Sequence, residues 1–139
     1  MQVRVYFEDT DCGQIVYHTN YIKYCERARS ELFFSNGFKP YVDDCGFVVS
    51  SIEAKFHTTA RLGDVLEVRT NIIQIKHSSL IAHQEIYRIY DGLNQKDDER
   101  LIFSMDCLLA FVDISKQKIV KIPPQMREVL QKTLGGDNA

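Results

Sequence analysis

The sequence predicts an α+β fold in which a curved antiparallel sheet of five strands wraps around one long central helix. Two observations predict it. A helical pattern near the N-terminus covers about four turns, and four long segments rich in β-branched and aromatic residues follow it. The chain has 139 residues, of which 45% are apolar and 26% charged. These values fit one compact domain over residues 1–139, large enough to bury a core.

The first predicted elements are a strand and the long helix. Residues 2–7 alternate and are β-rich, which indicates a strand. Thr19 and Asn20 are typical helix-start residues, and Asn36-Gly37 is a good C-terminal stop. Between them, a helix over residues 21–34 gathers its apolar side chains on one face: Tyr21, Tyr24, Cys25, Ala28, Leu32 and one of Phe33 and Phe34.

The rest of the chain predicts an antiparallel meander. Short turn signals separate strands expected at residues 47–56, 64–75, 79–90 and 101–112. Pro123-Pro124 precedes a short helix expected at about 125–134, and the tail 135–139 is expected to fray. Because one helix cannot cover both faces of such a sheet, we expect the other face and an edge to meet a partner subunit.

Composition excludes several classes of function. A net charge of −2 gives no general attraction to nucleic acid or membranes, and no apolar run is long enough to span a bilayer. The N-terminus lacks the features of a signal peptide, so we expect a cytoplasmic protein with reduced thiols. The four cysteines are scattered without a C-x-x-C pair, which argues against a metal site.

The most informative stretch is residues 9–20. Asp9 and Asp11 bracket a threonine, a turn-like segment follows, and His18 stands just before the helix start. A carboxylate beside the unpaired N–H groups of a helix N-terminus suits acyl-transfer chemistry, because those groups stabilise a developing oxyanion. The structural alternatives are that the aspartates form turns and that His18 is a polar neighbour of the helix start.

For other polar residues, the sequence gives weaker evidence of a functional role. Tyr17, Tyr21 and Tyr24 are typical core or interface anchors, and the charged residues of the helix are typical of a solvated face. The segments 55–61 and 76–79 are basic and rich in hydroxyl groups. Each alone is an ordinary exposed loop, but together on one rim they would hold phosphate groups.

The ordered set of residues resembles the signature of the 4-hydroxybenzoyl-CoA thioesterase family, and in particular its YbgC branch of acyl-CoA thioesterases associated with the Tol–Pal system. The resemblance covers nearly the whole chain. It rests on Arg4-Val5, Glu8-Asp9-Thr10-Asp11, Ile15-Val16-Tyr17-His18, Asn20-Tyr21, Glu26-Arg27-Ala28-Arg29, the turn Ala60-Arg61-Leu62-Gly63-Asp64, Ser78-Ser79-Leu80 and Val112-Asp113.

The resemblance implies the hot-dog fold, with sheets joined edge to edge in a homodimer, dimers pairing into a homotetramer, and active sites at the dimer interface. It assigns catalysis to Asp11 and an oxyanion-binding N–H to His18 or its neighbour; the His18 side chain also matches a residue implicated in this branch. Gln14 departs from the family, which has Gly or Ser at that position. A glutamine there implies either a different backbone or a side chain directed away from the site.

The resulting prediction is hydrolysis of an acyl-CoA thioester, with Asp11 as general base or nucleophile. Coenzyme A is then part of the substrate, and no separate cofactor is expected. The candidate substrate-binding residues are Tyr17, Arg61, Lys76, His77 and Ser78.

Several alternatives remain open at this point. They are a non-catalytic module that binds acyl-CoA or acyl carrier protein, and another hot-dog enzyme such as an acyl dehydratase. A serine or cysteine hydrolase is less favoured, since the chain lacks G-x-S-x-G.

Overall fold

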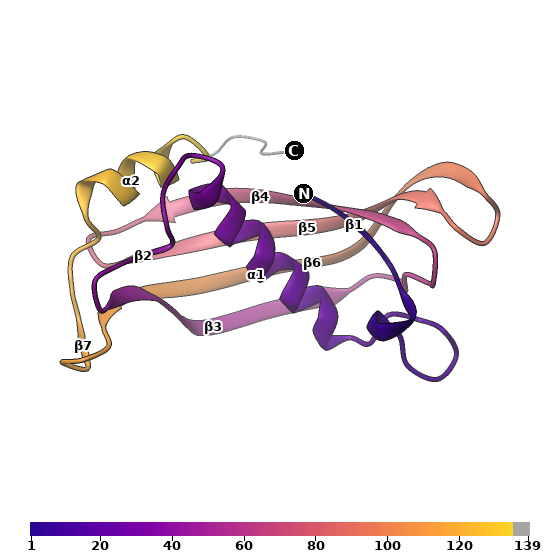
Figure 1. Cartoon of the computed structure of the whole chain (residues 1–139), viewed down its shortest axis with the longest axis horizontal. Helices are drawn as coiled ribbons and strands as arrows, with labels where there is room; N and C mark the ends of the chain where they lie inside the picture. The colour runs from indigo at the N-terminus through magenta and orange to yellow at the C-terminus, as the bar shows by residue number, and fades with distance from the viewer. Residues whose placement is uncertain (135–139) are drawn as a thin grey trace.

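The computed structural model describes residues 1–134, in which one long helix lies across one face of an antiparallel sheet (Figure 1). The expected α+β class is confirmed. A 3-10 turn (Phe7–Asp9) precedes the helix. The remaining elements are β1 (Gln2–Arg4), α1 (Thr19–Phe34), β2 (Tyr41–Val42), β3 (Cys45–Phe56), β4 (Val65–Ile75), β5 (Ser79–Asp91), β6 (Lys96–Asp113), β7 (Lys118–Ile119) and α2 (Pro124–Gln131).

The strand order differs from a simple meander. The sheet runs β1-β4-β5-β6-β3-β2, with β7 paired to β6, so β3 pairs with β6 and not with β4, its successor in sequence. The connection 57–64 therefore leads from β3, near one edge of the sheet, past β6 and β5 to β4, near the other edge. The described sheet has seven strands where five were predicted, because the two-residue strands β2 and β7 are too short to show a period.

Three predicted boundaries moved by more than two residues. The strand predicted over residues 2–7 ends at Arg4, and Phe7 instead begins the 3-10 turn. The strand β6 begins at Lys96, five residues before the predicted start, because the charged residues there continue the ladder with β5; Arg88 binds Asp98 across it at 2.7 Å. The helix α2 ends at Gln131, and the predicted tail 135–139 lies outside the described residues.

The core lies between α1 and the sheet. The helix buries the face that its periodicity predicted, and of the two phenylalanines near its end Phe33 is buried and Phe34 is exposed. Facing strand residues such as Leu66, Ile86 and Phe103 are fully buried, so the helix and sheet share one apolar cluster. No helix within residues 1–134 has the length and apolar character needed to cross a bilayer.

Two loops meet closely at one end of the sheet. A Cβ atom placed on Gly92 would lie 2.4 Å from the backbone carbon of Gly63, so only glycine fits there. The buried carboxylate of Asp64 accepts N–H bonds from Arg61 at 2.9 Å and from Gly92 at 2.8 Å. The turn after β5 is thereby fastened to the loop before β4.

The strand β3 forms a long edge of the sheet. It pairs with β6 along one side, whereas on its other side only Cys45 and Gly46 pair, with β2. Several of its apolar side chains are exposed: Val48, Val49, Ile52 and Phe56. An unpaired apolar edge of this length is a typical site for association with another strand.

Candidate active site

The Asp11 segment is a tight hairpin that leads into α1. Thr10 and Val16 form an antiparallel bridge, the N–H of Asp11 donates to the Ile15 carbonyl at 3.0 Å, and the N–H of Gln14 donates to the Asp11 carbonyl at 3.1 Å. Asp11 thus opens the turn, and its side chain is exposed. Within residues 1–134 its carboxylate accepts no hydrogen bond, which leaves it accessible to a substrate or a water molecule.

The hairpin turn needs two residues in the left-handed region. Gly13 has φ of 110° and Gln14 has φ of 62°. Gln14 thus adopts the left-handed conformation that a glycine favours. Its side chain is exposed to solvent.

Asp9 fastens the hairpin to the helix. Its carboxylate accepts the Tyr6 N–H at 2.9 Å, and its carbonyl accepts both the Tyr17 N–H and the Asn20 side-chain amide, each at 2.9 Å. Because the carboxylate closes the turn over Phe7–Asp9, Asp9 has a structural part in the site. The two aspartates of the motif therefore lie in different environments.

The start of α1 presents free backbone donors. His18 is the N-cap residue, with φ of −56° and ψ of −33°, and its side chain makes no capping hydrogen bond. Among residues 1–134, no backbone acceptor binds the N–H of His18 or of Thr19, whereas that of Tyr17 is used by Asp9. These free donors at the positive end of the helix are suited to bind a carbonyl oxygen that gains negative charge.

Aromatic side chains surround this helix start. The His18 ring lies 4.8 Å from the Tyr17 ring and 6.1 Å from the Phe56 ring, measured between centroids. Tyr21 stacks on Phe103 at 5.3 Å. Phe56 was missed in the sequence, because its position depends on the end of β3 meeting the start of α1; its aromatic character at the strand end was the only signal.

The Tyr21 hydroxyl joins the helix to the loop before β4. It accepts the Ala60 N–H at 2.9 Å, while Val16 donates its own N–H to the Ala60 carbonyl at 2.9 Å. Burial raises the pKa of Tyr21, so it stays protonated at neutral pH. Three segments of the chain are thereby held together around the hairpin.

Tyr24 lies one helical turn after Tyr21, on the buried face of α1. Its hydroxyl is buried and has no hydrogen-bond partner within residues 1–134. Burial, and then the negative charge of Asp9, raise the pKa of Tyr24. The hydroxyl therefore remains a neutral group on the core side of the helix.

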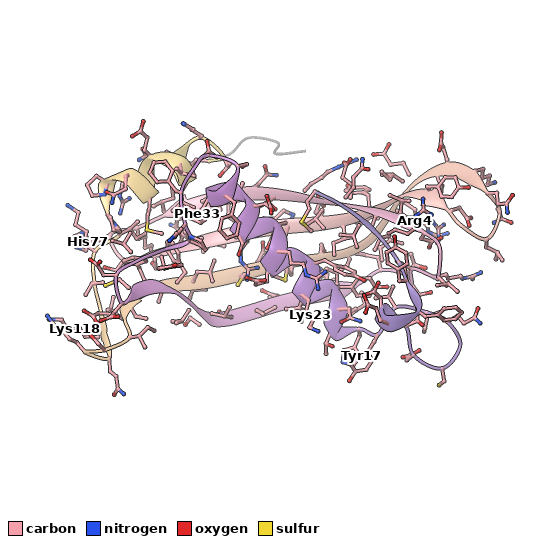
Figure 2. The ribbon with its side chains drawn as sticks, viewed as in Figure 1. Arg4, Tyr17, Lys23, Phe33, His77 and Lys118 are labelled. Carbon is pink, nitrogen blue, oxygen red and sulfur yellow. The ribbon has the colours of Figure 1, made fainter. Side chains whose placement is uncertain are left out.

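The predicted phosphate-binding residues are not together in one chain. Arg61 bridges to Ile15 and lies beside the Asp11 hairpin, with its side chain exposed. Lys76, His77 and Ser78 follow β4, whose 11 residues span roughly 36 Å. Figure 2 shows His77 at the end of the sheet opposite Tyr17. The expectation of one shared rim is therefore wrong for a single chain.

The residues at that opposite end have structural partners of their own. Arg127 donates to the carbonyls of Lys76 and His77 at 2.8 and 3.2 Å, and the Ser78 carbonyl accepts the Phe111 N–H. Within the described chain no three His, Cys, Asp or Glu side chains are arranged to hold a metal ion. The site segments that the structure brings together are the Asp11 hairpin, which leads directly into Tyr17 and His18, and the loop that carries Arg61.

A helix across an antiparallel sheet, with a carboxylate-bearing hairpin at the helix start, defines a protein of the hot-dog class. Comparisons with known proteins agree. The family model described as the thioesterase-like superfamily matches residues 5–130. A YbgC acyl-CoA thioesterase of Helicobacter pylori is 42% identical over 94% of this chain and 98% of its own length.

Other relatives extend the agreement. A YbgC acyl-CoA thioester hydrolase of Escherichia coli is 33% identical over 87% of each chain. The solved 4-hydroxybenzoyl-CoA thioesterase of a Pseudomonas species superposes with a TM-score of 0.79 at 26% identity, covering 93% of this chain and 96% of that one. The chain belongs to the thioesterase-like superfamily, in the branch of the YbgC acyl-CoA thioesterases.

Proposed function

We propose that this protein hydrolyses acyl-CoA thioesters to a free acid and coenzyme A in the cytoplasm, at the Asp11 hairpin. The observation that carries the proposal is the pairing of an exposed carboxylate, Asp11, with the unused N–H groups of His18 and Thr19 at the start of α1. The names of the relatives support the reaction type.

The proposed reaction begins with the thioester carbonyl oxygen on these N–H groups. In one route Asp11 removes a proton from water, the hydroxide oxygen bonds to the carbonyl carbon, and the carbon–sulfur bond then breaks. The thiolate of coenzyme A leaves and takes up the proton. In the other route an Asp11 oxygen attacks the carbon, the carbon–sulfur bond breaks and the coenzyme A thiolate leaves, and water then hydrolyses the resulting mixed anhydride. Both routes use the helix terminus to hold the negative oxygen.

The substitution Asp11→Asn tests the assignment. It removes the charge while keeping the shape, and we expect kcat for acyl-CoA hydrolysis to fall by about 100-fold or more. Glu8→Gln is the matched control, because Glu8 is an exposed carboxylate on the same segment that makes no hydrogen bond within residues 1–134. Near-normal turnover in Asp11→Asn, with unchanged circular dichroism, would overturn the assignment.

Isotope labelling tests for the mixed anhydride. A single turnover in water enriched in oxygen-18 leaves the label in the Asp11 carboxylate only if the mixed anhydride forms and water attacks its Asp11 carbonyl carbon. Label in Asp11 therefore establishes the anhydride route, whereas label only in the released acid fits the general-base route and also an anhydride that water attacks at the acyl carbon. Acyl thioesters of acyl carrier protein present the same bond, and they are the second substrate form to assay.

The assembly that we propose is a homodimer joined through the β3 edges, with further pairing of dimers through the uncovered face of the sheet. The support for the edge is its length and its exposed apolar side chains. Antiparallel pairing of two β3 strands reverses the partner sheet. It would bring the partner's 76–78 turn to the end where Arg61 lies, so that the two chains together form the rim for the phosphates of coenzyme A.

A further inference from the structure

A cavity separate from the Asp11 hairpin lies beside the C-terminal half of α1. It has a volume of about 250 Å³ and opens between the helix, the sheet and α2. It shares no lining residue with the Asp11 hairpin. Its lining is mostly apolar and includes Leu80, Leu109 and Leu130, with Glu26, Arg29 and Ser30 along the helix.

Arg29 is the unusual member of this lining. It is partly buried, and its Nη1 donates to the Gln84 Oε1 at 2.9 Å. Gln84 is itself fully buried and fixed, because its Nε2 donates to the Cys25 carbonyl at 2.8 Å and to the Thr70 hydroxyl at 3.0 Å. The guanidinium is therefore held against the cavity by a rigid polar network in the core.

The guanidinium keeps most of its binding capacity. Arginine has five N–H donors, and the bond to Gln84 is the only hydrogen bond from Arg29 within residues 1–134. No carboxylate of the described chain lies within 4.0 Å of it. The nearby Glu26 instead accepts the Ser30 hydroxyl at 3.0 Å and is exposed.

We propose that this cavity binds a free alkyl carboxylate, with the carboxylate on Arg29 and the hydrocarbon chain along Leu80, Leu109 and Leu130. An unpaired guanidinium at the wall of an apolar cavity matches the two halves of such an amphiphile. An engineered cavity of about 150 Å³ binds benzene, so a cavity of about 250 Å³ has room for an alkyl chain of medium length. The site stands independently of the proposed hydrolysis.

Calorimetric titration of the full-length protein with octanoate and with 1-octanol at neutral pH tests the proposal. We expect octanoate to bind saturably and about tenfold more tightly than octanol, the ratio that one charge-assisted hydrogen bond gives. Arg29→Met should abolish this discrimination, and Arg29→Lys should retain most of it. Glu26→Gln should tighten octanoate binding a few-fold, because it removes a negative charge near the carboxylate.

Each result supports or overturns the site. Absence of saturable octanoate binding to the unaltered protein, or equal affinities for the two ligands, would overturn it, as would discrimination that persists in Arg29→Met. If Arg29→Met does not fold, the site is still tested by comparing octanoate with 1-octanol on the unaltered protein and by the octanoate affinity of Glu26→Gln. Asp11→Asn should bind octanoate unchanged; a changed affinity would assign the binding to the hairpin instead of the cavity.

Discussion

At the residue scale, Asp9 and Asp11 have separate roles although the sequence makes them look equivalent. Asp9 fastens the turn through Tyr6 and the helix through Tyr17 and Asn20, whereas Asp11 is exposed. The spacing of the motif predicted a carboxylate near a helix start. It could not show which aspartate closes a turn, because that depends on the 3-10 turn Phe7–Asp9, which has no periodic signal.

Gln14 offers a stability test at the same scale. A left-handed conformation costs a non-glycine residue about 1–2 kcal/mol, part of which glycine gives back through its freer unfolded chain. We expect Gln14→Gly to raise the free energy of unfolding by about 0.5 kcal/mol in urea titrations. Gly13→Ala, at φ of 110°, is the opposing control and should lower it. A clear loss of stability in Gln14→Gly would contradict this account of the turn.

At the scale of elements, periodicity predicted most of the fold. The helix α1 and the strands β3, β4 and β5 appear within two residues of their predicted bounds, because each is long and half-buried. The pairing of β3 with β6 could not be predicted from periodicity, because strand order depends on contacts across the whole chain. The cavity beside Arg29 could not be predicted from the sequence either. The only sequence signal near it is the polar residue Gln84 at a position of β5 where the pattern calls for an apolar one.

The edge strand β3 gives the prediction at this scale. Ile52 lies near the middle of the unpaired stretch of β3, so a symmetric antiparallel pairing of two β3 strands would place the two Ile52 side chains close together. We therefore expect Ile52→Lys to separate the dimer, because two like charges would face each other across the interface. Analytical ultracentrifugation should show a shift toward the single-chain mass of 16.1 kDa.

Ile73→Lys is the matched control for that experiment. Ile73 is also exposed, at 51%, but it lies on β4 and away from the β3 edge. Its substitution should leave the edge-paired dimer intact. If the unaltered protein sediments as a monomer, or if Ile52→Lys remains dimeric, the edge-to-edge assembly is wrong.

At the scale of the whole molecule, two acidic turns link stability to pH. The Asn94 side chain and the N–H groups of Asn94 and Leu93 lower the pKa of Asp91, and the Ser115 hydroxyl with the Lys116 N–H lowers that of Asp113. A lowered folded-state pKa means that the unfolded chain binds protons first on acidification. The stabilisation is complete above the ordinary value of 3.8 and is lost as the pH falls through the folded values.

We therefore expect the free energy of unfolding to be insensitive to these two groups between pH 5 and 7, a range that lies more than one unit above 3.8. Below about pH 4 it should fall. The double variant Asp91→Asn with Asp113→Asn should start from a lower stability and lose less on acidification, as measured by urea titration at each pH. An equally steep acid loss in the variant would assign the effect to other carboxylates.

The contact between Gly63 and Gly92 limits how this protein can be engineered. The β5–β6 hairpin projects from one end of the molecule, where insertions and tags are commonly placed (Figure 1). The first residue of its turn, Gly92, however, lies against the loop that carries Arg61, and Asp64 binds both sides. A graft that replaces Gly92 would displace the loop beside the Asp11 hairpin, so an insert in this turn belongs after residue 92.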